Sequence, residues 1–269
     1  MNPRPAAPAH APSRPTLLCL HSSAGTGRQW DALRPALSAH ANVVAPDLLG
    51  YAGEAHWPVG TPVALDAEAR YLAPLVAAPQ VHLFGHSYGG AVALQIALRW
   101  PERVASLTLY EPVRFALLNH GPAFAASFEA IVGVGRRIGL DVISGSLQRA
   151  AARFVDYWSG DGTWAALSPQ RRLVVAARMP KVQAEFEAIF ADRVPPAAYR
   201  TLTMPVTLLG GSRSPLPARQ VLDVLEAHVP QATRATVEGE GHMAPVVAPA
   251  AVAAHLPAWM RALTWAAAA

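Results

Sequence analysis

Short apolar runs alternate with amphipathic stretches along most of the chain. The runs are too short for helices and continuous enough for buried parallel strands, and they lie at 16–20, 42–45, 81–84, 104–109, 206–209 and 232–237. Helical spacing of apolar residues marks 29–40, 63–78, 91–99, 216–228 and 249–263, with Pro74 kinking or ending the second of these. This alternation predicts an α/β fold with a mostly parallel central sheet and helices on both faces.

The alternation stops between residues 113 and 201, where the pattern is helical only. We therefore expect a core made of 16–112 and 202–269, interrupted by a helical cap at 113–201. Residues 1–15 are rich in proline and alanine without periodicity, which predicts a flexible tail. The cap is expected over the carboxyl ends of the strands, because ligands of such folds bind there.

The most informative motif follows the apolar run at 81–84 and precedes a helical pattern. It reads Gly85-His86-Ser87-Tyr88-Gly89, and a strand, a tight turn and a helix form the context that a G-x-S-x-G nucleophile requires. The glycines allow the strand and the helix to approach closely, so the serine hydroxyl projects clear of the sheet. We predict that Ser87 is the nucleophile. The alternative is a Gly-Ser-Gly turn without chemistry.

A serine hydroxyl needs a base, and the base needs an acid that orients it. His242 follows the last predicted strand in a glycine-rich loop, which makes it the candidate base rather than an ordinary loop histidine. His86 belongs to the serine motif, but its neighbouring position points it away from the serine. The expected order along the chain is serine, acid, histidine.

The acid is less obvious, because its usual place is the loop after the run at 206–209. Ser214 precedes a proline in that loop, and a serine cannot carry the negative charge that stabilises an imidazolium. Glu111 follows the run at 104–109, beside the strand that leads to Ser87, and its carboxylate is within reach of the same histidine. We predict that Glu111 is the acid; the alternative is a structural ion pair near the cap. Weaker candidates are Asp223, Glu238 and Glu240.

Two backbone N–H groups are needed to stabilise the oxyanion of an acyl-transfer intermediate. We expect one from Tyr88, directly after the nucleophile, and the other from Ser23, or Ser22, in the loop after the first strand. The alternative for that loop is a plain turn into the next helix. Aromatic residues of the cap predict an apolar pocket, and we expect Ser22, Phe115 and Trp158 to contact the substrate.

Taken together, these residues resemble the alpha/beta-hydrolase superfamily over roughly 16–263. The matching motifs are 20–23 in place of the family's His-Gly-x, 47–53 as a D-x-x-G-Y-x-G loop, 85–90 around the nucleophile, and Gly241-His242 at the base. Ser22 replaces the customary glycine and Ser214 the customary aspartate. Some members place a glutamate after the sixth strand, where Glu111 falls. Members usually begin with a pair of strands, and only about 15 residues precede the first run here, so we expect an exposed sheet edge.

The resemblance implies hydrolysis of a carboxylic ester, or a lactone, through an acyl-enzyme. Ser87 attacks, His242 takes and returns the proton, and Glu111 holds the imidazole. No metal and no cofactor are expected, since no histidine pair or Cys-x-x-Cys stands at ligand spacing. An amidase, a hydrolase of carbon–carbon bonds and a perhydrolase remain open on the same fold. So does a non-catalytic binding protein, which the missing aspartate favours.

Composition narrows the partners. Of 269 residues, 52% are hydrophobic and the formal net charge is +4, but the arginines are scattered, which predicts solvated helix faces and no nucleic-acid partner. No apolar run is long enough to span a membrane, and no secretion signal is evident. The single cysteine, Cys19, lies in a predicted strand, and we expect a cytoplasmic protein, bacterial by its alanine, proline and arginine usage. The exposed sheet edge leaves monomer and homodimer open.

Overall fold

The computed structural model describes residues 14–39, 41–51, 57, 61–76 and 80–261. Several predicted features extend outside the described residues. These are the tail up to residue 13, the ends of the predicted helices at residues 40, 77–78 and 262–263, and residues 52–53 of the glycine loop.

Six parallel strands form the central sheet, in the order β2-β1-β3-β4-β5-β6. The strands are β1 (Thr16–Leu20), β2 (Asn42–Val44), β3 (Val81–His86), β4 (Val104–Tyr110), β5 (Val206–Gly211) and β6 (Ala232–Val237). All six predicted runs are therefore strands, and within the described part of the chain β2 forms one edge of the sheet. The register pairs Gly85 with Leu109 and Leu109 with Leu208, so β3, β4 and β5 end level with one another.

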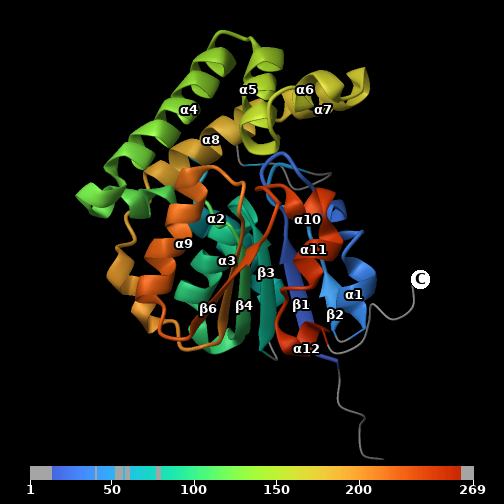
Figure 1. Cartoon of the computed structure of the whole chain (residues 1–269), viewed down its shortest axis with the longest axis vertical. Coiled ribbons are helices and arrows are strands. Elements are labelled where there is room, and N and C mark those ends of the chain that lie inside the picture. The colour runs from blue at the N-terminus through green and yellow to red at the C-terminus, as the bar shows by residue number, and fades with distance from the viewer. Residues whose placement is uncertain (1–13, 40, 52–56, 58–60, 77–79, 262–269) are drawn as a thin grey trace, which may run out of the picture.

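Helices cover both faces of the sheet, as predicted (Figure 1). One face carries α2 (Leu65–Leu72), α3 (Tyr88–Arg99) and α9 (Leu216–His228). The other carries α1 (Arg34–Ser38), α10 (Ala244–Val247), α11 (Pro249–Ala253) and α12 (Ala258–Arg261). Side chains alternate along β1: Leu18 and Leu20 belong to the first core, Leu17 and Cys19 to the second, and all four are inaccessible to solvent. Burial on both faces explains why the run lacks polar positions.

Prolines divide three of the stretches that have helical spacing. The stretch 29–40 divides into a 3-10 turn, η1 (Gly27–Trp30), and α1, which begins one residue before Pro35. The stretch 63–78 ends as α-helix at Leu72 and continues as η2 (Ala73–Val76) around Pro74. The stretch 249–263 divides into α11 and α12 on either side of Pro257. Proline lacks the N–H that an interior helical position must donate, so the continuous helices predicted at 29–40 and 249–263 were wrong, whereas the break predicted at Pro74 is confirmed.

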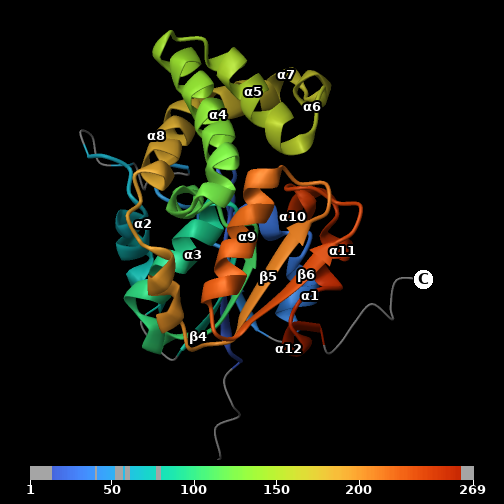
Figure 2. The same ribbon diagram turned by 60° about the vertical axis from the view of Figure 1, so that its left-hand side comes forward.

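Residues 113–201, which we call the helical segment, contain no strand, and all of them are described. The segment holds η4 (Phe115–His120), η5 (Pro122–Phe124), α4 (Ala125–Ile143), α5 (Leu147–Ser159), α6 (Thr163–Ala166), α7 (Pro169–Ala177), α8 (Met179–Phe190) and η6 (Pro196–Thr201). Both views place α4 to α8 beyond one end of the strands (Figures 1 and 2). The chain enters the segment where β4 ends and leaves it before β5, so these helices lie over the carboxyl ends of the strands. A short turn, η3 (Pro101–Arg103), leads into β4.

Candidate active site

Ser87 stands at the sharp turn between β3 and α3. Its backbone has φ 56° and ψ −118°, a left-handed conformation that is strained for a residue with a side chain. A Cβ on Gly85 would lie 2.6 Å from the Gly89 carbonyl oxygen, and a Cβ on Gly89 would collide with the backbone of Leu20. The turn can therefore form only with glycine on both sides of the serine, which explains the spacing of the motif.

Ser87, His242 and Glu111 form one chain of hydrogen bonds. The Ser87 Oγ lies 2.9 Å from Nε2 of His242, and Nδ1 of the same ring lies 2.6 Å from Oε2 of Glu111. The three residues are at most 5% exposed. A carboxylate only accepts hydrogen bonds, so Nδ1 carries the proton and Nε2 is left to accept the proton of Ser87. This is the arrangement that general-base activation of a serine requires.

Glu111 occupies its position through a strained turn of its own. It follows β4 with φ 45°, and its Oε1 accepts a 2.6 Å hydrogen bond from the N–H of Gly211 at the end of β5. A Cβ on Gly210 would lie 3.1 Å from that oxygen, so the end of β5 leaves space for the carboxylate. Ser214, which follows β5 in the sequence, is buried, and its hydroxyl has no hydrogen-bond partner among the described residues. The structure brings Glu111, and not Ser214, to the histidine.

His86 positions the loop that carries His242, a role that the sequence did not reveal. Its Nε2 lies 2.9 Å from the carbonyl oxygen of His242, and its Nδ1 lies 3.1 Å from Nε2 of Gln29. Because a carbonyl only accepts, Nε2 donates and Nδ1 accepts. Burial, then the nearby His242, holds the pKa of His86 well below its ordinary value, which keeps the ring neutral. The hydroxyl of Tyr110 adds a 2.8 Å hydrogen bond to the carbonyl of Gly241. The only signal in the sequence for this role is the position of a histidine inside the serine motif.

In the loop after β1, the two predicted residues Ser22 and Ser23 face different directions. Ser23 lines the same small cavity as Ser87, beside the start of α3 where the Tyr88 N–H lies. Ser22 faces the other way: its N–H and its hydroxyl both donate to Oε1 of Gln29, at 3.0 and 2.8 Å. The structure therefore does not bring Ser22 to the cavity. From the helical segment, Arg178 donates to the Ala24 carbonyl at 2.6 Å, which ties this loop to the helices above it.

The cavity over Ser87 is small and mostly apolar. Its volume is about 10 Å³, which is room for one water molecule. Phe115 and Trp158 line it, and the centroid of the Trp158 ring lies 4.1 Å from that of the His242 ring. The remaining lining residues are Ser23, Val113, Phe154, Val182, Glu185, Phe186 and Ile189. An organic substrate is far larger than one water, so its entry requires side chains of the helical segment to move.

The described residues show neither a metal-binding cluster nor a membrane-spanning helix. Among the described residues, no group of three His, Cys, Asp or Glu side chains is arranged to hold a metal ion. Within the same ranges, no helix is long and apolar enough to cross a membrane.

Comparison with known proteins identifies the family. Residues 15–249 match the family described as alpha/beta hydrolase fold, so the chain belongs to that family. The chain is 37% identical over 83 residues to the 2-hydroxy-6-oxo-2,4-heptadienoate hydrolase of Pseudomonas putida, an alignment that covers only 30% of that protein and 30% of this chain. It is 28% identical over 242 residues to the pimeloyl-(acyl-carrier protein) methyl ester esterase of Klebsiella pneumoniae, covering 87% of this chain and 89% of the esterase.

Solved structures agree with the family. A hydrolase from Pseudomonas aeruginosa superimposes with a TM-score of 0.71 at 23% identity, covering 91% of both chains. The predicted α/β-hydrolase fold is thus confirmed. The relatives named above are hydrolases, which supports the expectation that the chain is an enzyme of this class.

Proposed function

We propose that this chain is a serine hydrolase that cleaves carboxylic esters, lactones included, of apolar substrates through an acyl-enzyme. The observation that carries the proposal is the unbroken chain of hydrogen bonds from Glu111 through His242 to Ser87, at 2.6 and 2.9 Å. No other cluster in the described residues offers a nucleophile, a base and a matching acid within hydrogen-bond distance.

Each residue of the site has one part in the reaction. Ser87 Oγ attacks the carbonyl carbon while its proton passes to Nε2 of His242, and Glu111 stabilises the imidazolium that forms. The backbone N–H groups of Tyr88 and Ser23 face the developing oxyanion. The intermediate collapses when the alcohol leaves with the proton from His242. A water molecule, deprotonated by the same ring, then attacks the acyl-enzyme. The bond to Ser87 Oγ breaks, the ring returns the proton to that oxygen, and the acid is released.

The helical segment 113–201 acts as the cap in this proposal. Phe115 and Trp158 present their rings to the cavity, which favours apolar acyl or aryl groups over charged ones. Binding first displaces cap side chains, since the closed cavity holds about 10 Å³. Residues 16–112 and 202–269 form the catalytic core in this proposal. We also assign the protein to the cytoplasm, as a monomer or homodimer, on the strength of the buried lone Cys19 and the sheet edge at β2.

A hydrolase of carbon–carbon bonds is the second candidate. The observation in its favour is the local similarity to the Pseudomonas putida relative, which is named as a hydrolase of 2-hydroxy-6-oxo-2,4-heptadienoate. The esterase relative covers far more of this chain, 87% against 30%, and therefore supports the ester first.

Labelling with a fluorophosphonate followed by intact-mass measurement tests the proposal. We expect a single adduct on the wild type and none on Ser87→Ala. A panel of p-nitrophenyl esters, a lactone and a 2-hydroxy-6-oxo-dienoate then separates the two candidates. A folded wild-type protein without any adduct would contradict the proposal and favour a binding protein that keeps the fold.

A further inference from the structure

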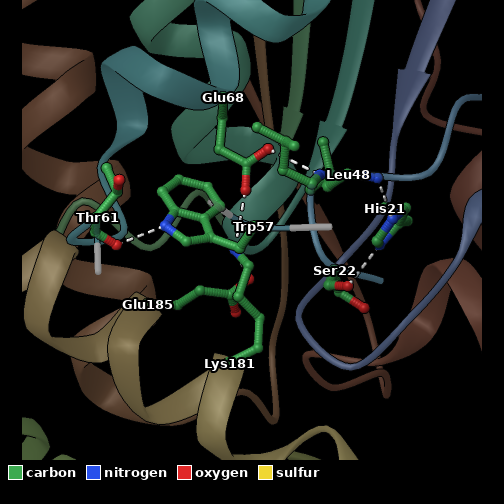
Figure 3. Close-up of polar contacts among 9 residues, drawn as sticks. His21, Ser22, Leu48, Trp57, Thr61, Glu68, Lys181 and Glu185 are labelled. Atoms are coloured by element: carbon green, nitrogen blue, oxygen red, sulfur yellow. Dashed lines mark hydrogen bonds and ion pairs between the residues drawn. The ribbon is translucent and has the colours of Figure 1, made fainter. Parts of the chain in front are cut away.

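A buried cluster of three charged side chains joins the cap to the core beside the active-site cavity. Lys181 and Glu185 come from α8, and Glu68 comes from α2 (Figure 3). The Lys181 ammonium lies 2.9 Å from Oε1 of Glu68 and 3.1 Å from Oε1 of Glu185. The carboxylate side chains are 0% and 2% exposed, and that of Lys181 is 10% exposed. The family's serine machinery makes no use of this cluster.

Two of the three groups have hydrogen-bond partners within the protein. Lys181 contacts both carboxylates and lies over three aromatic rings, 4.7 Å from the centroid of Trp57, 5.1 Å from Tyr88 and 5.3 Å from Tyr51. Burial opposes its charge, but the neighbouring carboxylates outweigh burial and raise the pKa of Lys181. The second oxygen of Glu68, Oε2, accepts a 3.1 Å hydrogen bond from the backbone N–H of Leu49. Both oxygens of Glu68 and the ammonium of Lys181 therefore have partners within the protein.

Glu185 differs from both. Its Oε2 is buried and has no hydrogen-bond partner among the described residues. The same residue is the one charged member of the cavity wall, alongside Ser87. A buried oxygen without a partner is costly, and such atoms in native proteins are normally served by a ligand, a water or another side chain. The apolar side chains of the cavity wall supply no donor to it, and the hydroxyl of Tyr51, which interacts with Glu185, likewise has no geometric hydrogen bond among the described residues.

We propose that Glu185 Oε2 recognises the substrate by accepting a hydrogen bond from a hydroxyl group on an otherwise apolar ester. This deepens the proposed function and rests on it. The acceptor is held in place by Lys181, which fixes the other oxygen of the same carboxylate. Specificity follows because an analogue with a methyl in place of the hydroxyl leaves the buried oxygen unpaired.

Charge in the neighbourhood favours a neutral donor over an ammonium. Glu68 and Glu185 against Lys181 leave one negative charge, and Arg178, whose guanidinium carbon lies 5.9 Å from the centroid of the Tyr51 ring, offsets it. The phenol of Tyr51 is the competing donor inside the protein. Burial and the Glu185 carboxylate raise the pKa of Tyr51 well above its ordinary value, so it stays a neutral hydroxyl at this site.

The test measures binding without turnover. Isothermal titration calorimetry on Ser87→Ala compares methyl (4-hydroxyphenyl)acetate with methyl (4-methylphenyl)acetate, and the corresponding phenylpropanoate and phenylbutanoate pairs vary the reach. Glu185→Met removes the acceptor and keeps the length of the side chain. Glu187→Met makes the same change on the exposed side of α8 and serves as the matched control. Should Glu185→Met fail to fold, Glu185→Gln replaces it, since its amide can keep Lys181 and turn an NH₂ group to the cavity.

We expect the hydroxyl member of at least one pair to bind on the order of 10- to 100-fold more tightly, the effect of leaving a buried acceptor unpaired. The preference disappears in Glu185→Met or Glu185→Gln and persists in Glu187→Met. In Tyr51→Phe it persists or grows, because the competing phenol is gone. Equal binding of every pair, no binding of either member, a preference that survives the Glu185 variants, or its loss in Tyr51→Phe would each overturn the proposal. Failure of the proposed function shows separately, as absence of fluorophosphonate labelling on the wild type.

Discussion

Replacing Glu111 by glutamine separates its chemical role from its structural one. In the wild type the Gly211 N–H donates a 2.6 Å hydrogen bond to Glu111. The glutamine oxygen can still accept this bond, so the turn after β4 stays in place. The amide NH₂ then faces Nδ1 of His242 where a carboxylate oxygen now lies at 2.6 Å. A donor at that position forces Nδ1 to accept and puts the ring proton on Nε2. The histidine can then no longer take the proton of Ser87.

The expected loss is about 10⁴-fold in kcat, the size seen when the acid of a Ser-His-Asp site becomes its amide. That factor corresponds to about 5 kcal/mol of transition-state stabilisation. The free energy of unfolding should fall by no more than about 1.5–3 kcal/mol, the contribution of the lost charge-assisted bond, because a neutral bond remains at Gly211. The assay is kcat on the best p-nitrophenyl ester, with Ser214→Ala as control and expected within about twofold of the wild type. A Glu111→Gln enzyme that kept a tenth of wild-type kcat would refute the assignment.

Three further changes have defined outcomes. Gly85→Ala places a Cβ 2.6 Å from backbone atoms of the following helix. We therefore expect the free energy of unfolding to fall by about 1–3 kcal/mol and fluorophosphonate labelling to be lost. Gly121→Ala, whose Cβ meets nothing within 4 Å, should change neither. Burial lowers the pKa of His21 to about 4, so the unfolded chain binds the proton first as pH falls below about 6.5, and His21 should contribute about 2 kcal/mol to the loss of stability between pH 7 and pH 5. Urea titrations at both pH values check this, and an equal drop in His21→Asn would contradict it. Trp158→Ala removes the ring 4.1 Å from His242 and should raise kcat/KM for hexanoate relative to acetate esters on the order of tenfold; an unchanged ratio would show that this ring does not limit the pocket.

Features that arise from neighbouring residues could be predicted from the sequence. The six strands follow from apolar runs, and the turn at Ser87 follows from steric clashes that only glycine relieves. Proline effects are equally local, yet a continuous helix was expected at 29–40, although Pro35 lacks the N–H that a helix interior needs and lies instead in the first turn of α1. The prediction followed the periodicity of apolar residues and overlooked the proline, which was visible in the sequence.

Contacts between distant residues needed the tertiary structure. Glu111 and His242 are 131 residues apart, and their 2.6 Å contact depends on the register that brings β4 and β5 to the same level. The sequence could nominate both residues by residue type and loop position, because few carboxylates and histidines follow strands. It could not show that Ser214 stays away from the ring.

The chain of amino acids by itself determined the class of the protein: an alternating α/β pattern, a serine on a glycine-flanked turn, and a histidine after the last strand. Only the tertiary structure decided which way the side chains face. It turned Ser22 toward Gln29, set His86 under the carbonyl of His242, and placed a glutamate of the helical segment, Glu185, in the wall of the cavity. The physical reason is that local patterns depend on sterics between near neighbours. The direction of a buried polar side chain depends instead on partners that the fold brings from elsewhere in the chain.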